Sequence, residues 1–407
     1  MVSTAQHLTD LAVALSSRGH AVTVVTSNRG YDNPNLRFKR REQWQSITIL
    51  RIPSLHLGKQ TKWRRAWTFA SFFCSCALRL LFLRRFDTVV VLTSPPLLSF
   101  LAALFVKVKG GRLSFWVMDL NPDEAIAAGW LPRNSWLTAL LQWMLDSSLR
   151  TADEIVVLDR FVKDRIQRRV VSPSRISIIP PWSHSDVVSY SLDGRKRFRE
   201  QHEIADKFVV MYSGNHSPCH SLDTLLRAAL ALKDRDDIVF YFIGGGSEQA
   251  KVGRFAESHH LTNIKCLPYQ PLQQLSDSLS AADMHVVVMG DQFVGIVHPC
   301  KIYNIITIGT PALYIGPSSS HIMDLAPELA TGQFFAAGHG EHELVVAHIL
   351  QCASLSDSRF HLAHGQATAY SKEVLLPQLW SLLEAGDPRH QGILAGTVLN
   401  VTTEQEL

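Results

Sequence analysis

Short, almost continuously apolar runs alternate with stretches of helical periodicity along the whole chain. Runs of this kind are typical of strands buried on both faces, and they require a parallel sheet that helices cover. A first series of strands is expected at residues 21–26, 47–52, 88–93, 113–118, 154–158 and 175–179. A second series is expected at residues 208–213, 238–243, 263–267, 284–289 and 311–315. The pattern predicts an α/β protein with two doubly wound, Rossmann-like domains.

The 407 residues are enough for two such domains. We expect an N-terminal domain over residues 1–186 and a C-terminal domain over residues 207–370. The segment 187–206 is charged and lacks periodicity, so it is interpreted as a linker. Residues 371–385 are expected to form a C-terminal helix, which could cross back to the first domain, and residues 386–407 a loosely ordered tail.

The first domain begins with a helical pattern instead of a strand. Ser3 to Gln6 form a capping box, and Ala5, Leu8 and Leu15 follow at helical spacing. A doubly wound sheet normally starts with a strand whose loop leads into the first helix. We therefore expect the first strand of this domain and its glycine-rich loop to be missing, and the printed start to lie inside a longer coding region.

Composition excludes several classes of protein. Apolar residues make up 46% of the chain and charged residues 19%, which excludes a disordered or fibrous protein. Six cysteines are scattered without a CxxC pair, which argues against a zinc ribbon or a disulfide framework and fits a reducing compartment. The 18 histidines show no spacing typical of a metal site, and no secretory leader is recognisable. We therefore expect a cytoplasmic protein without a metal.

The charge is distributed unevenly. Residues 1–150 hold 19 Lys and Arg against 8 Asp and Glu, a net +11, whereas residues 151–407 hold 21 against 28, a net −7. A basic first half suggests an anionic partner, such as a membrane surface, a nucleic acid or a phosphorylated substrate. The alternative is a basic face that is merely solvated.

A basic and aromatic segment, 59–85, lies within that half. Its apolar stretch 66–83 is only 18 residues long and contains Arg79, so a membrane-spanning helix is disfavoured. The segment fits a helix that lies in the membrane interface, and equally a core helix with a basic first turn. The residues expected on the membrane or acceptor side are Lys62, Trp63, Arg64, Arg65 and Trp67.

Two glycine-containing loops follow strands of the second series and precede helices. Such loops direct backbone N–H groups and a helix N-terminus at a phosphate, and ligands of open α/β sheets bind at these carboxyl ends. One loop alone is weak evidence, whereas two in one domain favour phosphate binding over ligand-free turns. The candidate residues are Gly214, Asn215 and His220 in the first loop and Gly244, Gly245 and Gly246 in the second.

Lys301 lies at the start of a predicted helix after the strand 284–289, so it reaches the same edge of the sheet. A single lysine is usually a solvated charge, but beside two glycine loops Lys301 is interpreted as a candidate contact to a phosphate or a hydroxyl group.

Asp119 ends the predicted strand 113–118 of the first domain. It is a candidate general base, or a group that orients sugar hydroxyls. Asp123 and Glu124, which follow Pro122, are interpreted as helix-capping residues.

Together these segments resemble a glycosyltransferase of the GT-B fold, family 4, close to the colanic-acid-type and fucosaminyl-transferase-like bacterial enzymes. The resemblance covers roughly residues 1–385. It is carried by RGHAVTVVTS near the start, TSPPLL at 93–98, DLNPDEAIAAGWL at 119–131, ADEIVVLDRF at 152–161, IIPPWSHSD at 178–186, YSGNHSPCHSLDTLL at 212–226, FIGGG at 242–246 and HPCKIYNIITIGTP at 298–311.

The resemblance implies a retaining sugar transfer from a nucleotide-diphosphate sugar, which is a co-substrate, without a required metal. In the family an Arg and a Lys five residues later hold the diphosphate, and these positions fall on Asn215 and His220. Two Glu separated by seven residues fall on Ile296 and Asn304, so Asn304 would contact the ribose without a charge. These departures indicate either subgroup character or weakened activity.

The resemblance places the donor in the cleft between the domains. Backbone N–H groups around Gly214 and Gly244–Gly246, with His220 and Lys301, would neutralise the leaving diphosphate. The base-binding loop of the family falls on Tyr269 and Gln270.

The acceptor is expected to be a lipid-linked glycan of a surface polysaccharide, positioned by Asp119. The segment 59–85 would dock on anionic lipid at the inner face of the plasma membrane, and no nucleic-acid partner is expected. The alternatives are a nucleotide-sugar epimerase of the same fold and a catalytically degenerate scaffold homologue.

Overall fold

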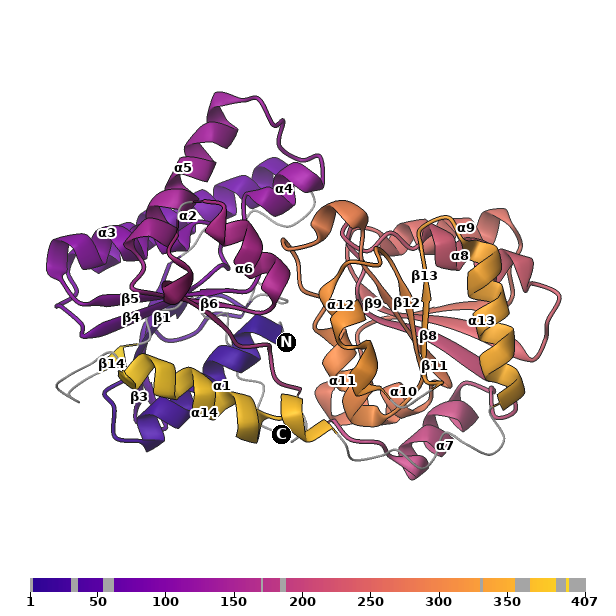
Figure 1. The fold of residues 1–407 in the computed structure, drawn as a ribbon. Coiled ribbons are helices and arrows are strands. Elements are labelled where there is room, and N and C mark those ends of the chain that lie inside the picture. The colour runs from indigo at the N-terminus through magenta and orange to yellow at the C-terminus, as the bar shows by residue number, and fades with distance from the viewer. Residues whose placement is uncertain are drawn as a thin grey trace. The chain divides into compact units, whose positions relative to one another are not determined.

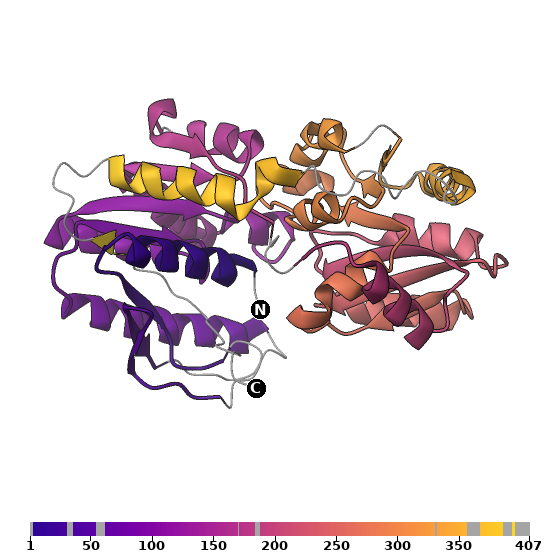
Figure 2. The same cartoon turned by 90° about the horizontal axis from the view of Figure 1, so that it is seen from below.

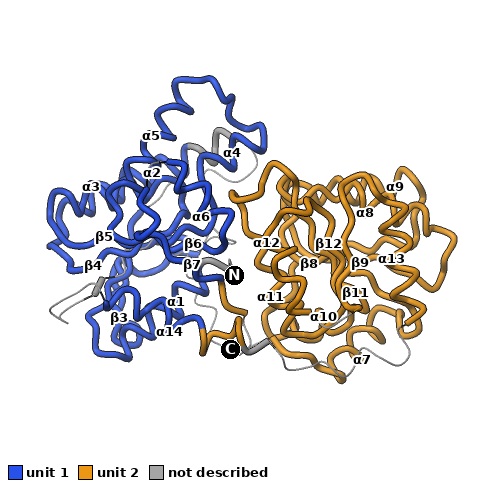
Figure 3. Tube along the Cα trace, in the orientation of Figure 1, with its two compact units in different colours: residues 1–180, 375–407 blue, residues 181–374 orange. Residues whose placement is uncertain are grey.

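The computed structural model describes residues 3–30, 36–53, 62–169, 171–183, 188–329, 332–355, 367–385 and 393–394. It divides the chain into two compact units (Figures 1 and 3). Unit 1 consists of residues 1–180 with 375–407, and unit 2 of residues 181–374. Both are α/β structures, as the alternation of apolar runs and helical periods predicts.

The strands of unit 1 form two sheets in the described part of the chain. The larger has the order β14-β4-β5-β6-β7 and is parallel throughout. The smaller has the order β1-β3-β2. The bounds are β1 (Thr23–Ser27), β2 (Arg41–Trp44), β3 (Ile47–Ile52), β4 (Thr88–Leu92), β5 (Arg112–Val117), β6 (Glu154–Val157), β7 (Ile176–Ile178) and β14 (Ile393–Leu394). The predicted strands of the first series are confirmed within a few residues.

Two strands of unit 1 differ from expectation. β2 runs antiparallel to β3, because Gln45 and Ser46 both take positive φ values, 46° and 64°, and close a two-residue hairpin. β14 lies in the segment 386–407, which we expected to be loosely ordered, and pairs in parallel with the edge of β4. The described strands of the first domain thus form a mainly parallel structure, as expected, but they are divided between two sheets, and the smaller sheet contains one antiparallel pair.

Helices cover both faces of the unit 1 strands. The helices α2 (Lys62–Leu81), α3 (Leu98–Lys109) and α5 (Trp136–Thr151) lie on one side in Figure 1, and α1 (Ser3–Ser17) and α14 (Lys372–Ala385) on the other. The shorter α4 (Asp123–Ala127) and α6 (Arg160–Gln167) complete the unit.

The C-terminal helix α14 lies beside α1 on the same face of unit 1 (Figure 2). The Arg18 guanidinium donates two hydrogen bonds of 2.8 Å to the Glu384 carboxylate and stacks 3.5 Å from the centre of the Trp380 ring. His20 Nε2 lies 2.7 Å from the same carboxylate. Residues from the two ends of the described chain thus hold this face together.

Unit 2 contains one parallel sheet with the order β10-β9-β8-β11-β12-β13 in its described residues. The bounds are β8 (Phe208–Asn215), β9 (Ile238–Gly245), β10 (Ile264–Leu267), β11 (Met284–Val288), β12 (Ala312–Ile315) and β13 (Phe334–Ala337). The five predicted strands are confirmed, and β13 was not predicted.

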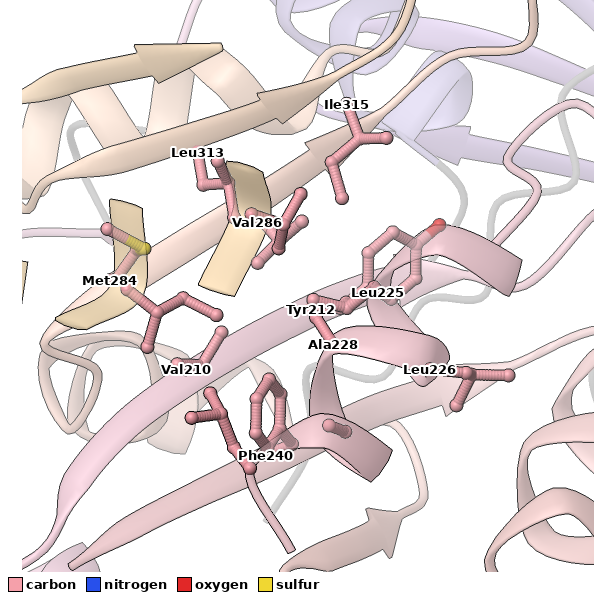
Figure 4. Packing of buried hydrophobic residues seen from close by; sticks show 14 of the residues in the cluster. Val210, Tyr212, Leu225, Leu226, Ala228, Phe240, Met284, Val286, Leu313 and Ile315 are labelled. Atoms are coloured by element: carbon pink, nitrogen blue, oxygen red, sulfur yellow. The ribbon is translucent and has the colours of Figure 1, made fainter. Parts of the chain in front are cut away.

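Alternate side chains of these strands supply two cores. On one face Val210, Tyr212 and Phe240 pack against Leu225 and Leu226 of α8 (Asp223–Ala231), as Figure 4 shows, and this face is completed by α9 (Gln249–Ser258) and α13 (His342–Leu355). The other face packs against α7 (Leu192–Gln201), α10 (Leu275–Ser280) and α11 (Lys301–Ile308). Because successive side chains of a strand point to opposite faces, both faces of this sheet are apolar and both are covered by helices.

The segment 187–206 contains α7, so the linker expected there is wrong over most of its length. Arg195 and Arg199 both pair with Asp283 at the start of β11, the second at 3.0 Å. Phe198 of the same helix is buried. The helix is held by a partly buried ion-pair network, which leaves little apolar periodicity in the sequence.

Candidate functional site

Two loops at the carboxyl edge of the unit 2 sheet touch through their backbones. Gly214 and Gly244 are partners in the β8–β9 register and have φ values of 140° and 137°. A Cβ on Gly244 would lie 2.0 Å from the Gly214 carbonyl oxygen, and a Cβ on Gly246 would lie 2.2 Å from that of His216. These two glycines are required by the contact between the loops themselves.

Lys301, the first residue of α11, points into this edge. Its Nζ atom is buried and lies 3.5 Å from the centre of the Tyr212 ring. A Cβ on Gly214 would come within 3.2 Å of the same Nζ atom. The ammonium group makes no hydrogen bond with any described residue. It is therefore not the solvated charge that a single lysine usually is.

Two histidines lie near this ammonium group. His220 Nδ1 is 2.8 Å from the Val288 carbonyl oxygen, and because a carbonyl only accepts, Nδ1 carries the proton and Nε2 keeps a lone pair. His216 is buried against the Tyr212 ring at a centroid distance of 5.0 Å, and neither of its ring nitrogens makes a hydrogen bond of normal geometry in the described structure. We call Tyr212, His216, His220 and Lys301 the Lys301 cluster.

Burial sets the protonation of the Lys301 cluster. It lowers the pKa of Lys301 to about 7. Burial, and then the charge of Lys301, lower the pKa of His216 to about 4 and that of His220 to about 3. The two imidazoles are neutral at pH 7, and Lys301 is the group that can be positive. A buried cation without a counter-ion is suited to binding an anion.

Of the other predicted donor-binding residues, Tyr269 and Asn215 contact these loops. Tyr269 donates from its hydroxyl to the Gly245 carbonyl oxygen at 3.3 Å, and the Asn215 side chain lies against Gly246. Asn304 is one turn after Lys301 in α11. The amide of Gln270 donates within its own loop, to Pro268 at 3.0 Å. The structure thus gathers all but Gln270 around the two loops and α11.

A polar pocket of about 430 Å³ opens at the same carboxyl edge of unit 2. Segments 218–227, 290–292 and 339–340 line it. Arg227 lies on α8, and His339 Nε2 donates to the Met289 carbonyl oxygen at 2.9 Å. Neither residue was predicted, because they come from separate segments without a shared motif.

Asp119 follows β5 in unit 1, and its backbone N–H donates to Thr93 Oγ1 at 3.2 Å. Burial, and then the negative charge of Glu124, raise the pKa of Asp119 to about 7. A carboxyl group poised near neutrality can take or give a proton at physiological pH.

The capping role expected for Asp123 is wrong. Its carboxylate is buried and accepts hydrogen bonds of 2.6 Å from Arg169, with Arg165 at 3.4 Å, whereas α4 has no side-chain cap. The carboxylate is held by two arginines of a distant segment, which the local sequence does not reveal.

The basic and aromatic segment forms the start of α2. Lys62, Trp63, Arg64 and Arg65 belong to its first turn, but their side chains lie outside the described part of the structure. Trp67 is 62% exposed, while Phe72 and Cys76 are buried. The helix therefore has one packed side and one open side. No helix in the described residues is long and apolar enough to cross a membrane.

The chain matches two protein families in succession. Residues 4–182 match the glycosyl transferase 4-like domain, and residues 194–319 match the glycosyl transferases group 1. It is 26% identical over 313 residues to the putative colanic acid biosynthesis glycosyl transferase WcaI of Escherichia coli K12, covering 74% of this chain and 76% of that protein. It is 24% identical over 249 residues to the probable glycosyltransferase WbjE of Pseudomonas aeruginosa, covering 61% and 62%.

Solved structures share the fold. Sucrose-phosphate synthase from Thermosynechococcus elongatus superposes with a TM-score of 0.68 at 14% identity, covering 92% of this chain and 91% of that one. Anabaena HepE, solved in complex with UDP and glucose, gives a TM-score of 0.67 at 14% identity, covering 94% and 96%. Both likenesses concern the fold.

Proposed function

Since the chain belongs to the family 4 glycosyltransferases of the GT-B fold, we propose that it moves a sugar, with retention, from a nucleotide-diphosphate sugar to a lipid-linked acceptor. The product would be a surface polysaccharide or its precursor. This proposal is supported by the similarity to WcaI, a putative colanic acid biosynthesis glycosyl transferase, and by the UDP bound in HepE.

The observation that carries the proposal is the buried ammonium group of Lys301. Family 4 uses an Arg and a Lys to hold the diphosphate, and those positions are Asn215 and His220 here. Lys301 reaches Gly214 from α11 and can supply the positive charge that the two positions lack. Charge on the leaving diphosphate grows in the transition state, so a fixed cation there lowers the barrier. No metal is needed for this step in the proposal.

The remaining donor contacts follow from the loops. Tyr269 and Gln270 would face the base, and Asn304 the ribose. Pro218 and Ser221, which flank His220 in the sequence, line the 430 Å³ pocket. Side chains in its lining, such as Arg227, can donate hydrogen bonds to sugar hydroxyls.

The acceptor side belongs to unit 1. Asp119, with its raised pKa, would take the proton of the acceptor hydroxyl or orient it. A lipid-linked acceptor would bring the protein to a membrane, where the exposed side of α2 can lie on the surface.

Thermal unfolding with UDP, GDP, dTDP and CMP tests the donor site. A nucleotide at about a hundred times its dissociation constant should stabilise by about 2.7 kcal/mol and raise the midpoint by roughly 5–10 °C. Lys301→Met should lose this shift, because it removes the charge but keeps the volume. Lys233→Met, at an exposed position of the same unit, should keep it. If the nucleotide raises the unfolding midpoint of Lys301→Met as much as that of the wild type, Lys301 does not belong to the nucleotide site.

Turnover tests the reaction itself. Consumption of the donor only when a polyprenyl-diphosphate-linked glycan is added supports transfer. Isomerisation of the donor alone would identify an epimerase instead, and nucleotide binding without turnover would identify a degenerate scaffold.

A further inference from the structure

We infer that unit 1 docks on an anionic lipid bilayer through a surface built jointly by α2, α3 and α5, with the tryptophans of α5 as its second anchor. The contact proposed above involves only the segment 59–85. The inference extends that contact to α5, and it rests on exposed side chains instead of on the catalytic proposal.

The first half of α5 presents large apolar side chains outward. Trp136 and Trp143 are 79% and 54% exposed, and Leu140 is exposed between them at helical spacing. The opposite side of the helix carries Thr138 and Leu145, which are buried. An ordinary surface helix has polar residues on its outer side. An exposed apolar stripe of this kind instead indicates a surface that contacts a membrane or another molecule.

The start of α5 is fixed in place. Ser135 Oγ accepts a hydrogen bond of 3.1 Å from the Thr138 backbone N–H, and Thr138 Oγ1 donates to the Pro132 carbonyl oxygen at 2.7 Å. The exposed tryptophans therefore sit on a capped, ordered helix and not on a frayed end.

The helix α2 repeats the arrangement. Trp67, Cys74, Leu78 and Leu81 recur at helical spacing on its open side, and Phe82 after its end is 80% exposed. Such a stripe extends over four turns of the helix. Two helices of the same unit thus expose apolar stripes.

The helix α3 joins the two stripes into one surface. It packs against α2 and against α5, and all three lie on the same side of the strands (Figure 1). Its Phe100 ring lies 5.5 Å from that of Trp143, and Leu104 and Val108 are exposed on it. The apolar area therefore continues from α2 to α5.

The charges around this surface favour lipid over protein. The segments 67–112 and 136–151 together contain seven basic residues and two acidic residues, Asp87 and Asp146. The basic residues are Arg79, Arg84, Arg85, Lys107, Lys109, Arg112 and Arg150. A second copy of the chain would bring like charges together, whereas anionic headgroups complement them, and tryptophan is suited to the interface between headgroup and acyl chain.

Co-sedimentation of the full chain with phosphatidylcholine vesicles, with and without phosphatidylglycerol, tests the inference. We expect binding to the anionic vesicles, a blue shift of tryptophan emission, and weaker binding at high salt. The triple variant Trp136→Ser, Leu140→Ser, Trp143→Ser should bind at least about tenfold more weakly. The double variant Leu192→Ser, Leu344→Ser, which removes exposed apolar side chains of unit 2, should bind as the wild type does.

Equal vesicle binding by the triple variant, or none by the wild type, would overturn the inference. If the wild type is a dimer without lipid and the triple variant is a monomer, the surface instead binds a second copy of the chain. Trp136→Ser alone gives a milder test if the triple variant is unstable. Nucleotide-induced stabilisation, measured on the same proteins, should not change, which separates failure of this surface from failure of the donor site.

Discussion

Lys301 couples protonation to both stability and ligand binding. Its folded-state pKa is about 7 against an ordinary 10.5, so between these values the unfolded chain holds one more proton. The free energy of unfolding should therefore rise as the pH increases from about 7 toward 10.5. Affinity for a nucleoside diphosphate should fall over the same range, because the neutral amine no longer attracts the anion. Urea unfolding and calorimetric titration across this range measure the two effects.

Lys301→Met isolates the effect from the other titrating groups. It should stabilise the ligand-free protein at pH 7, on the order of 1–3 kcal/mol, because a buried group without a hydrogen bond is removed. Its pH dependence of unfolding should be flatter than that of the wild type. Parallel pH profiles for the two proteins would show that the amine is solvated and not buried.

The glycines of the two loops make a separate prediction. Gly246→Ala places a Cβ 2.2 Å from the His216 carbonyl oxygen at a φ of 134°, so we expect a loss of roughly 2 kcal/mol or more in urea unfolding. Gly253→Ala, within α9 and with open space around its Cβ beyond the helix's own backbone, should be neutral or stabilising by up to about 1 kcal/mol. A tolerated Gly246→Ala would mean that the loops separate readily.

Among the elements, α14 is held on unit 1 by charge as well as by packing. The Arg18 hydrogen bonds, followed by that from His20, lower the pKa of Glu384 to about 2. The stability this contributes is present above about pH 4.5 and is lost as the pH falls through about 2. Glu384→Gln should lose about 0.5–1 kcal/mol at pH 7, since the pair is partly exposed. Glu373→Gln, an exposed position of the same helix, should differ little from the wild type in urea unfolding.

The elements that sequence reasoning found are those buried on both faces. Nearly continuous apolar runs such as β8 and β11 were located within a residue or two, because a strand covered on both faces has few polar positions. The strand β2, with the sequence REQW at an edge, has no such run. The helix α7 was missed because arginines paired with Asp283 replace an apolar face.

The candidate site was predictable in its location but not in its chemistry. Strand ends and glycines indicated the edge of the sheet, and Lys301 was placed there by its position after β11. Its burial over Tyr212 depends on packing between distant segments. The same holds for Arg227 and His339, which share a pocket only in the folded unit.

At the scale of the whole molecule, the proposed donor and lipid sites belong to different units. The Lys301 cluster and the 430 Å³ pocket lie in unit 2, whereas α2, α3 and α5 lie in unit 1. A ligand stabilises only the folded form of the unit that binds it. Scanning calorimetry should therefore show two transitions, of which a nucleotide raises one and anionic vesicles raise the other. Lys301→Met should abolish the first shift alone, and the triple α5 variant the second alone. A single transition raised by either ligand would mean that the two units unfold as one cooperative body, and the binding energy of each ligand would then stabilise the whole chain.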